Sequence, residues 1–125
     1  MKRYVTAPGA PPPGGPYSHA VAAQGGLVFL AGQGPTNPVT GEIPAGFEAQ
    51  ARQTLNNLAT VAEAAGGSLR DAIRVGVFMS DMSNFPAFNA VYSEFFEPPY
   101  PARTTVQSNL PGFEIEIDAV LALAE

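Results

Sequence analysis

Cysteine and tryptophan are absent from the 125-residue sequence, and histidine and lysine each occur once. Without cysteine the chain can form no disulfide, no thiolate nucleophile and no cysteine-ligated metal site. A single histidine, with no carboxylates at ligand spacing, gives no basis for a metal centre. The net charge of −5 disfavours binding to a polyanion, so we expect no nucleic-acid partner.

Long hydrophobic runs are also missing. No apolar stretch approaches membrane-spanning length, and the opening residues MKRYVTAPGA lack the apolar core of a secretory signal. We therefore expect a cytosolic protein that does not bind membranes.

The residues that are present are those of a folded globule, with 46% hydrophobic and only 14% charged positions. A chain of this length predicts a single domain over residues 1–125. So few charges on so small a body indicate that other subunits cover part of its apolar surface.

The hydrophobic pattern predicts the element order βββαβαββ, which is an α+β fold. Apolar residues three and four positions apart predict a helix over 47–65, stopped by Gly66, and a second over 83–97, stopped by Pro98-Pro99. The expected strands are residues 3–6, 18–23, 27–31, 72–80, 103–107 and 113–123. Both helices should cover one face of a mixed sheet, and a neighbouring subunit should cover the other.

Finer features of these elements can also be predicted. The run 27–31 is apolar without alternation, which favours a central strand buried on both faces. On the strand 72–80 the residues alternate, with Ile73, Val75, Val77 and Met79 on one side. Ser83 or Asn84 should cap the second helix.

A serine–histidine catalytic pair is not supported. Ser18 and His19 are adjacent, so on a strand their side chains point to opposite faces. We interpret His19 as a partly exposed strand residue, and its participation in a site stays open.

Arg103 is the first candidate for chemistry, because it follows three prolines and opens a β-branched run. If the strands 103–107 and 113–123 pair as a hairpin, Arg103 approaches the alternating acids Glu114, Glu116 and Asp118. A guanidinium in a cleft can bind a substrate carboxylate through two parallel bonds, and a nearby carboxylate can position a water. A cross-strand salt bridge on the surface would show the same pattern, and the pattern alone does not separate the two.

Five segments resemble the RidA (YjgF) family in order and spacing across nearly the whole chain: GPYSHAV, AGQGPTNPVTGEIPAGFEAQARQTLNNL, VFMSDMSNFPAFNAVYSEFF, YPARTTV and EIEIDAV. The resemblance implies a chorismate-mutase-like α+β fold that assembles as a homotrimer, with three clefts between subunits and no cofactor. Family members hydrolyse short-lived imines and enamines, such as 2-iminobutanoate and 2-aminoacrylate, to 2-keto acids and ammonia.

The resemblance also assigns roles to individual residues. Arg103 matches the arginine that holds the substrate carboxylate, and Glu116 matches the glutamate that holds the water and assists ammonia departure. Tyr17 matches the tyrosine lining the cleft, Gly32 a backbone contact, and Asn89 a polar residue at the cleft edge.

Other positions in the implied binding set depart from the family pattern. Thr105, which follows Thr104 in this set, stands where cysteine is frequent, so its hydroxyl or backbone is expected to contact substrate. Ala31 replaces a frequent serine, and Gly34 replaces a branched apolar residue, which would remove a pocket wall. Gly34 thus favours an alternative, a specialised member that deaminates a larger amino-substituted unsaturated acid. A non-catalytic or RNA-directed role is a further alternative, against which the negative net charge argues.

Overall fold

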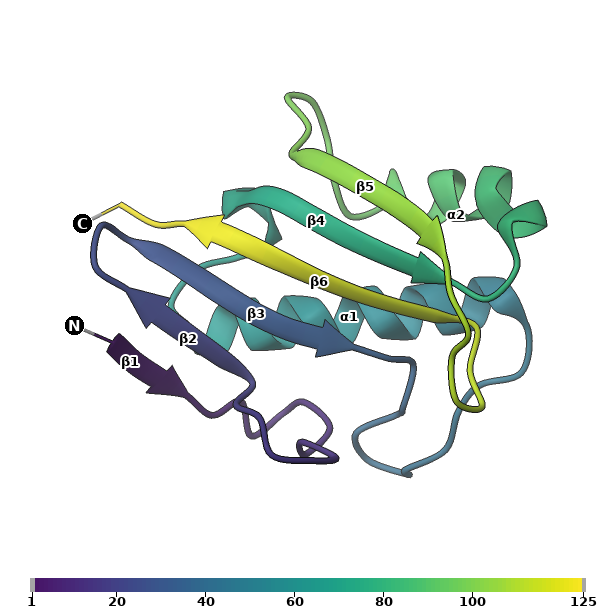
Figure 1. Ribbon diagram of the computed structural model, residues 1–125, viewed down its shortest axis with the longest axis horizontal. Helices are drawn as coiled ribbons and strands as arrows, with labels where there is room; N and C mark the ends of the chain where they lie inside the picture. The colour runs from purple at the N-terminus through teal and green to yellow at the C-terminus, as the bar shows by residue number, and fades with distance from the viewer. Residues whose placement is uncertain (1, 125) are drawn as a thin grey trace.

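The computed structural model describes residues 2–124, which form one mixed sheet with both helices on the same face (Figure 1). The predicted α+β class and the order βββαβαββ are confirmed. The strands are β1 Lys2–Val5, β2 Ala20–Ala23, β3 Leu27–Gln33, β4 Ala72–Met79, β5 Ala102–Gln107 and β6 Ile115–Ala122. The helices are α1 Phe47–Ala64 and α2 Phe85–Tyr92, with 3₁₀ turns at Leu69–Asp71 and Met82–Asn84.

The strand order is β1-β2-β3-β6-β4-β5. Neighbouring strands are antiparallel except β4 and β5, which are parallel and joined through α2. The expected hairpin between residues 103–107 and 113–123 is therefore wrong, because β4 lies between β5 and β6. The physical reason is that β6 is strongly apolar on its helix-facing side and takes a central place, with a partner on each edge.

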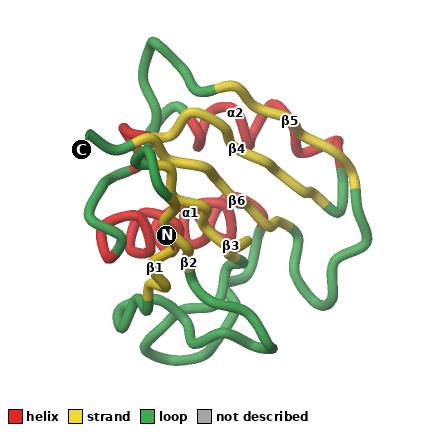
Figure 2. Tube along the Cα trace, turned by 60° about the vertical axis from the view of Figure 1, so that its left-hand side comes forward, coloured by secondary structure: helices red, strands yellow, loops and turns green. Residues whose placement is uncertain are grey.

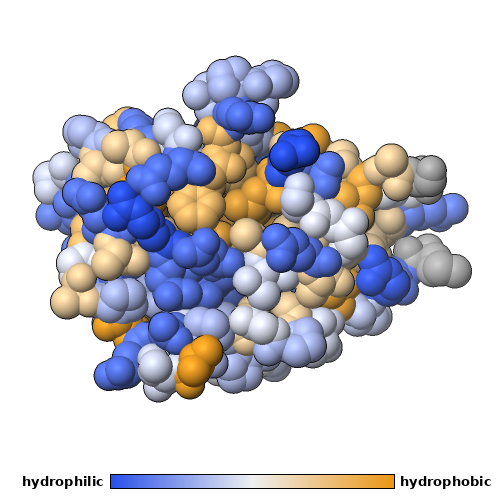
Figure 3. Space-filling model, turned by 180° about the vertical axis from the view of Figure 1, so that it is seen from behind, coloured by the Kyte–Doolittle hydropathy of each residue, from blue (hydrophilic) through white to orange (hydrophobic). Residues whose placement is uncertain are grey.

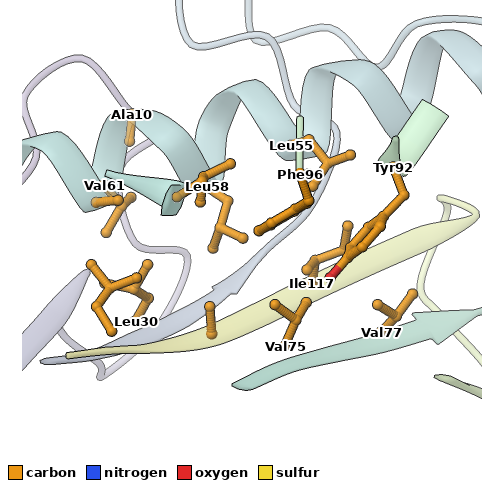
Figure 4. Close-up of a cluster of buried hydrophobic side chains, with 14 of the residues drawn as sticks. Ala10, Leu30, Leu55, Leu58, Val61, Val75, Val77, Tyr92, Phe96 and Ile117 are labelled. Atoms are coloured by element: carbon orange, nitrogen blue, oxygen red, sulfur yellow. The ribbon is translucent and has the colours of Figure 1, made fainter. Parts of the chain in front are cut away.

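Helix α1 lies across β3 and β6, and its apolar stripe forms one wall of the core (Figure 4). It ends as predicted, because Gly66 adopts a positive φ of 96° that disfavours other residues. The Gly67 N–H then donates to the Ala62 carbonyl at 3.0 Å, and the Gly66 N–H to the Glu63 carbonyl at 3.0 Å. The Gly66 bond satisfies a carbonyl that the end of the helix would otherwise leave unpaired, and the Gly67 bond joins one from the Ala65 N–H at 3.2 Å on the Ala62 carbonyl.

Helix α2 is shorter than predicted and is capped differently. Neither Ser83 nor Asn84 caps it through a side chain; instead the Asp81 carboxylate accepts from the Ser83 N–H at 2.9 Å and caps the preceding 3₁₀ turn. Pro86 sits in the first turn, where a missing N–H costs nothing. The turn after the helix buries Phe96, whose ring stacks on Tyr92 with centroids 4.3 Å apart.

The sheet face opposite the helices is uncovered in the single chain and carries apolar residues. Strand β3 is central, but Phe29 is 51% exposed, so its expected burial on both faces is not found here. Ile73 is also exposed, because a register irregularity between Ala72 and Arg74 takes it out of the buried series. Among residues 2–124, no helix has the length and hydrophobicity needed to cross a membrane.

Candidate functional site

Two long loops meet at one end of the sheet, the β1–β2 loop and the β3–α1 loop (Figure 2). Together they line a hollow of about 420 Å³. Three residues of the predicted site border it, namely Tyr17, Gly32 and Gly34, and so does Phe113, which the sequence pattern did not indicate. The Tyr17 side chain is half exposed, and its hydroxyl accepts a bond from the Gly14 N–H at 3.0 Å.

His19 fastens the first of these loops. It is only 4% exposed, its Nδ1 accepts from the Ala7 N–H at 3.0 Å, and its Nε2 lies 2.8 Å from the Pro11 carbonyl oxygen. Because Nδ1 accepts, the proton of the neutral imidazole belongs on Nε2, which donates to Pro11. The interpretation of His19 as a partly exposed strand residue is thus wrong, since β2 begins at Ala20. Both ring nitrogens hold the loop in place, which leaves neither for proton transfer.

Two buried amides of α1 fasten the second loop. Asn57 Nδ2 donates to the carbonyls of Gly34 at 2.9 Å and Thr36 at 2.8 Å. Gln50 donates to the Pro44 carbonyl at 3.0 Å and accepts from the Glu114 N–H at 2.9 Å. The signal for these residues in the sequence was available, since polar side chains seven positions apart interrupt the core-facing side of a helix.

Gly32 and Glu116 are in direct contact. The register of β3 against β6 shifts between Leu30 and Gln33, and a Cβ built on Gly32 would lie 2.6 Å from Glu116 Oε2. Only glycine lets the carboxylate lie against this backbone. Burial raises the pKa of the Glu116 carboxyl, and the nearby Asp118 charge raises it further. A raised pKa makes Glu116 a stronger proton acceptor than an ordinary surface carboxylate.

Arg103 forms a second cluster on α2 and β5. Its Nη2 donates to Asn89 Oδ1 at 2.8 Å, and its guanidinium lies over the rings of Tyr92 at 4.7 Å, Phe88 at 5.3 Å and Phe85 at 5.6 Å. Within residues 2–124 it makes no ion pair, so the salt-bridge alternative does not describe it. A cation held by an amide oxygen and aromatic faces keeps its capacity to bind an anion.

The aromatic support of Arg103 is itself buried. Burial raises the pKa of the Tyr92 phenol to about 12, although the Arg103 charge acts in the opposite direction. The phenol therefore stays protonated at neutral pH and serves as a neutral platform. Thr105 lies next to Arg103 on the same face of β5, and its buried Oγ1 has no hydrogen-bond partner among residues 2–124.

Arg103 and Glu116 lie on opposite faces of the sheet. Arg103 is paired with Val75, which is fully buried under the helices, whereas Glu116 alternates with the buried Ile115 and Ile117. In one chain the two side chains therefore cannot meet. The predicted residues fall into two groups, which we call the arginine cluster and the glutamate cluster. The arginine cluster contains Arg103, Asn89 and Thr105; the glutamate cluster contains Glu116, Gly32, Gly34 and Tyr17.

Two predicted binding residues belong to neither cluster. Thr104 is exposed on the face of β5 opposite Arg103, and Ala31 is half-buried in the irregular part of β3. A larger hollow, of about 680 Å³, lies under the loop that leads into β5 and contains none of the predicted site residues. Figure 3 shows this helix side of the molecule, where apolar side chains gather below that projecting loop.

The fold and these clusters define a small α+β protein built on one mixed sheet, with a guanidinium on one face and an acid on the other. A profile of the family described as Endoribonuclease L-PSP matches residues 8–123, and the chain belongs to this family. The predicted relationship to RidA (YjgF) proteins is thereby confirmed.

Individual relatives cover almost the whole chain. A RutC family protein of Pyrococcus horikoshii is 46% identical over 123 residues, which is 96% of this chain and 97% of its own. The 2-iminobutanoate/2-iminopropanoate deaminase of Escherichia coli K12 is 39% identical over 125 residues, with 96% and 97% covered. The crystal structure of RidA from an Antarctic Psychrobacter superposes with a TM-score of 0.91 at 37% identity, covering 97% of this chain and 99% of that one.

Proposed function

We propose that the protein hydrolyses reactive 2-imino acids, and the enamines that tautomerise to them, to 2-keto acids and ammonia without a cofactor. The observation that carries this proposal is the Arg103 guanidinium, which is held in place by Asn89 and three aromatic rings but has no anionic partner within residues 2–124. A substrate carboxylate is the anion that its planar donor set fits. The deaminase name of the E. coli relative supports the same reaction.

The position of the two clusters favours a site built from two subunits. Because Arg103 and Glu116 lie on opposite faces of one sheet, a site that uses both must combine two copies of the chain. The uncovered sheet face, with Phe29 51% and Val106 41% exposed, offers an apolar surface for such contacts. We infer a cytosolic homotrimer with one cleft between each pair of subunits.

In this cleft Arg103 of one subunit binds the substrate carboxylate, and Glu116 of the next holds a water. The water oxygen attacks C2 of the imine, its proton passes to the Glu116 carboxylate, and the C=N π electrons move to nitrogen. Glu116 then passes this proton to the nitrogen, which gives a carbinolamine. The Glu116 carboxylate next takes the proton of the new hydroxyl group and delivers it to the nitrogen, so that the C–N bond breaks, ammonia leaves and the C=O bond forms. An imine is already electrophilic, so orientation and charge placement supply most of the acceleration.

The other predicted residues complete the cleft. The buried Thr105 hydroxyl lies beside Arg103 and can bond to the substrate, and the Tyr17 ring closes one side. Ala31 and Thr104, which belong to neither cluster, are assigned no proton-transfer step in this mechanism.

RNA cleavage, which the family description names, is the competing function. The net charge of −5 and the Glu116 and Asp118 carboxylates on the uncovered face would repel a phosphate backbone. We therefore expect no cleavage of RNA at the concentration that suffices for imine hydrolysis.

The test combines ammonia release from freshly generated 2-iminobutanoate with subunit mixing. Arg103→Ala and Glu116→Gln chains should each be inactive alone. Co-expressed in equal amounts, they should regain activity, because about one quarter of randomly assembled sites draw the intact arginine from one chain and the intact glutamate from its neighbour. Inactive mixed oligomers would show that one chain supplies both residues, and an inactive wild-type protein would refute deamination.

A further inference from the structure

Gly34 and Phe113 lie against each other at the border of the hollow, which Gly32 also lines. A Cβ on Gly34 would lie 3.5 Å from Phe113 Cε2 and 3.7 Å from Cζ, so the ring lies against the glycine at ordinary contact distance. Gly34 is not among the glycines with a positive φ, so its backbone would accept any L-residue. The absence of a side chain at Gly34 therefore affects the space in the hollow and relieves no backbone strain. The Phe113 ring forms the wall that a side chain at Gly34 would otherwise make.

The hollow is large for a substrate with a methyl or ethyl side chain. Its volume of about 420 Å³ falls within the range of about 300–1,000 Å³ that holds drug-sized ligands. The hollow also opens next to Glu116, the residue proposed to hold the attacking water, because Gly32 borders the hollow and contacts Glu116. A substrate side chain that extends from C2 of the imine in the direction away from Arg103 has this space available.

Within residues 2–124, no charged side chain lines the hollow. Its border consists of neutral residues: Pro11, Pro12, Gly14, Tyr17, His19, Gly32, Gln33, Gly34, Thr36, Asn37, Pro38, Gly41 and Phe113. Both nitrogens of His19 are occupied, and Asn37 Oδ1 accepts from the N–H groups of Val39 and Thr40. The hollow thus offers a ligand two aromatic rings, Tyr17 and Phe113, beside the neutral side chains of Gln33 and Thr36, and an aromatic group would pack on the rings.

The walls are held before any ligand binds. His19 anchors Pro11 on one side, and Asn57 anchors the Gly34 and Thr36 carbonyls on the other. A preformed subsite lowers the ordering cost of binding a large group.

We propose that this hollow is the side-chain subsite of the deaminase, and that Gly34 and Phe113 make it select 2-imino acids with a bulky apolar, preferably aromatic, side chain. This inference rests on the proposed function, since it concerns the same cleft.

The kinetic test compares two imines produced in the cuvette by a flavin amino-acid oxidase, with catalase present, from phenylalanine and from 2-aminobutyrate. The wild-type protein should show the higher kcat/KM for the aromatic imine. Gly34→Val, which places branched carbons in the hollow, should lower the ratio of aromatic to small kcat/KM at least tenfold. Phe113→Leu, which keeps an apolar side chain but removes the ring, should lower the same ratio.

The matched control is Val39→Ile, which adds one methylene on the same loop at a side chain that is 91% exposed. It should leave both rates unchanged. A wild-type preference for the small imine, or an unchanged ratio in Gly34→Val, would overturn the inference.

A binding measurement separates this inference from the proposed function. The stable products phenylpyruvate and 2-oxobutanoate are titrated by calorimetry into the wild-type, Gly34→Val and Arg103→Ala proteins. Tighter binding of phenylpyruvate that both variants weaken, in a protein that hydrolyses no imine, would support the subsite and refute deamination. Efficient deamination with no preference in either measurement would refute the subsite alone.

Discussion

Replacing Arg103 by lysine tests the proposed carboxylate contact while keeping the positive charge. The guanidinium offers parallel N–H donors that fit both oxygens of a carboxylate, whereas an ammonium is a point charge. The hydrogen bond to Asn89 at 2.8 Å and the three rings fix the guanidinium orientation, so a lysine would lack this geometry and part of the stacked surface.

The expected effect on activity can be worked out from these interactions. Removing a pair of charge-assisted hydrogen bonds in a cleft costs roughly 2–4 kcal/mol of transition-state binding, about thirty- to a thousand-fold in kcat/KM. Stability should fall much less. The stacking over Tyr92, Phe88 and Phe85 contributes about 0.5–2 kcal/mol, and lysine retains part of it, so the melting temperature should fall by about 2–5 °C.

The assay is ammonia release from 2-iminobutanoate, with a thermal melt on the same samples. Arg52→Lys is the matched control, because Arg52 also holds a carboxylate through two bonds, Nε to Glu94 Oε1 at 3.0 Å and Nη2 to Oε2 at 2.7 Å, on the exposed surface. That variant should keep the wild-type rate. An Arg103→Lys protein within about threefold of the wild-type kcat/KM would refute the carboxylate role, since the removal of two such bonds cannot cost so little.

Three further changes test other residues. Glu116→Gln should lower kcat about a hundredfold or more. Because the pKa of Glu116 is raised in the folded state, the charged carboxylate destabilises the folded protein as pH rises through that pKa. The variant should therefore melt at or above the wild-type temperature at pH 7 and lose this advantage below the pKa of the unfolded state. The acid limb of the wild-type pH–rate profile should also vanish in this variant. Thr105→Ala should change KM more than kcat, and a kcat loss as severe as that of Arg103→Ala would show that its role is misassigned. His19→Ala should lower the free energy of unfolding by about 2–4 kcal/mol, because it leaves the Ala7 N–H and Pro11 carbonyl without their partner, and a melt unchanged within about 1 °C would contradict this.

The sequence was sufficient to predict which segments form helices and strands, because each segment carries its own periodicity. The stripe of α1 and the alternation of β6 are local properties, and Gly66 ends α1 for a local steric reason. Strand pairing is not local. From its sequence, the strand in 113–123 could pair with β5, which precedes it in the chain, or with a strand from farther away. Only the competition of all strands for the core places β4 between β5 and β6.

The candidate site shows the same limit. Arg103 and Glu116 were named as candidate site residues from the sequence. Their placement on opposite faces of the sheet could not be predicted, because it depends on the parallel register of β4 and β5. Likewise, the core-facing positions of Asn57 and Gln50 could have been noticed in the sequence, but only the path of the β3–α1 loop gives their amides carbonyls to bind. The position of His19 was predicted wrongly because the loop that it anchors, residues 7–11, has no periodicity from which its path could be deduced.

Within residues 2–124 of a single chain, neither Arg103 nor Glu116 forms an ion pair. The proposed function needs this, because both charges must be free to act on the substrate. Giving Arg103 a permanent anionic partner should therefore stabilise the folded chain and weaken substrate binding. Asn89→Asp does so with almost no change of shape, since a carboxylate oxygen would replace the amide oxygen 2.8 Å from Arg103 Nη2. The new charge-assisted bond should raise the melting temperature, while competition with the substrate carboxylate should raise KM at least tenfold. Asn56→Asp makes the same change at an exposed position of α1 and should alter neither quantity. An Asn89→Asp protein with an unchanged KM would mean that Arg103 does not bind the substrate carboxylate.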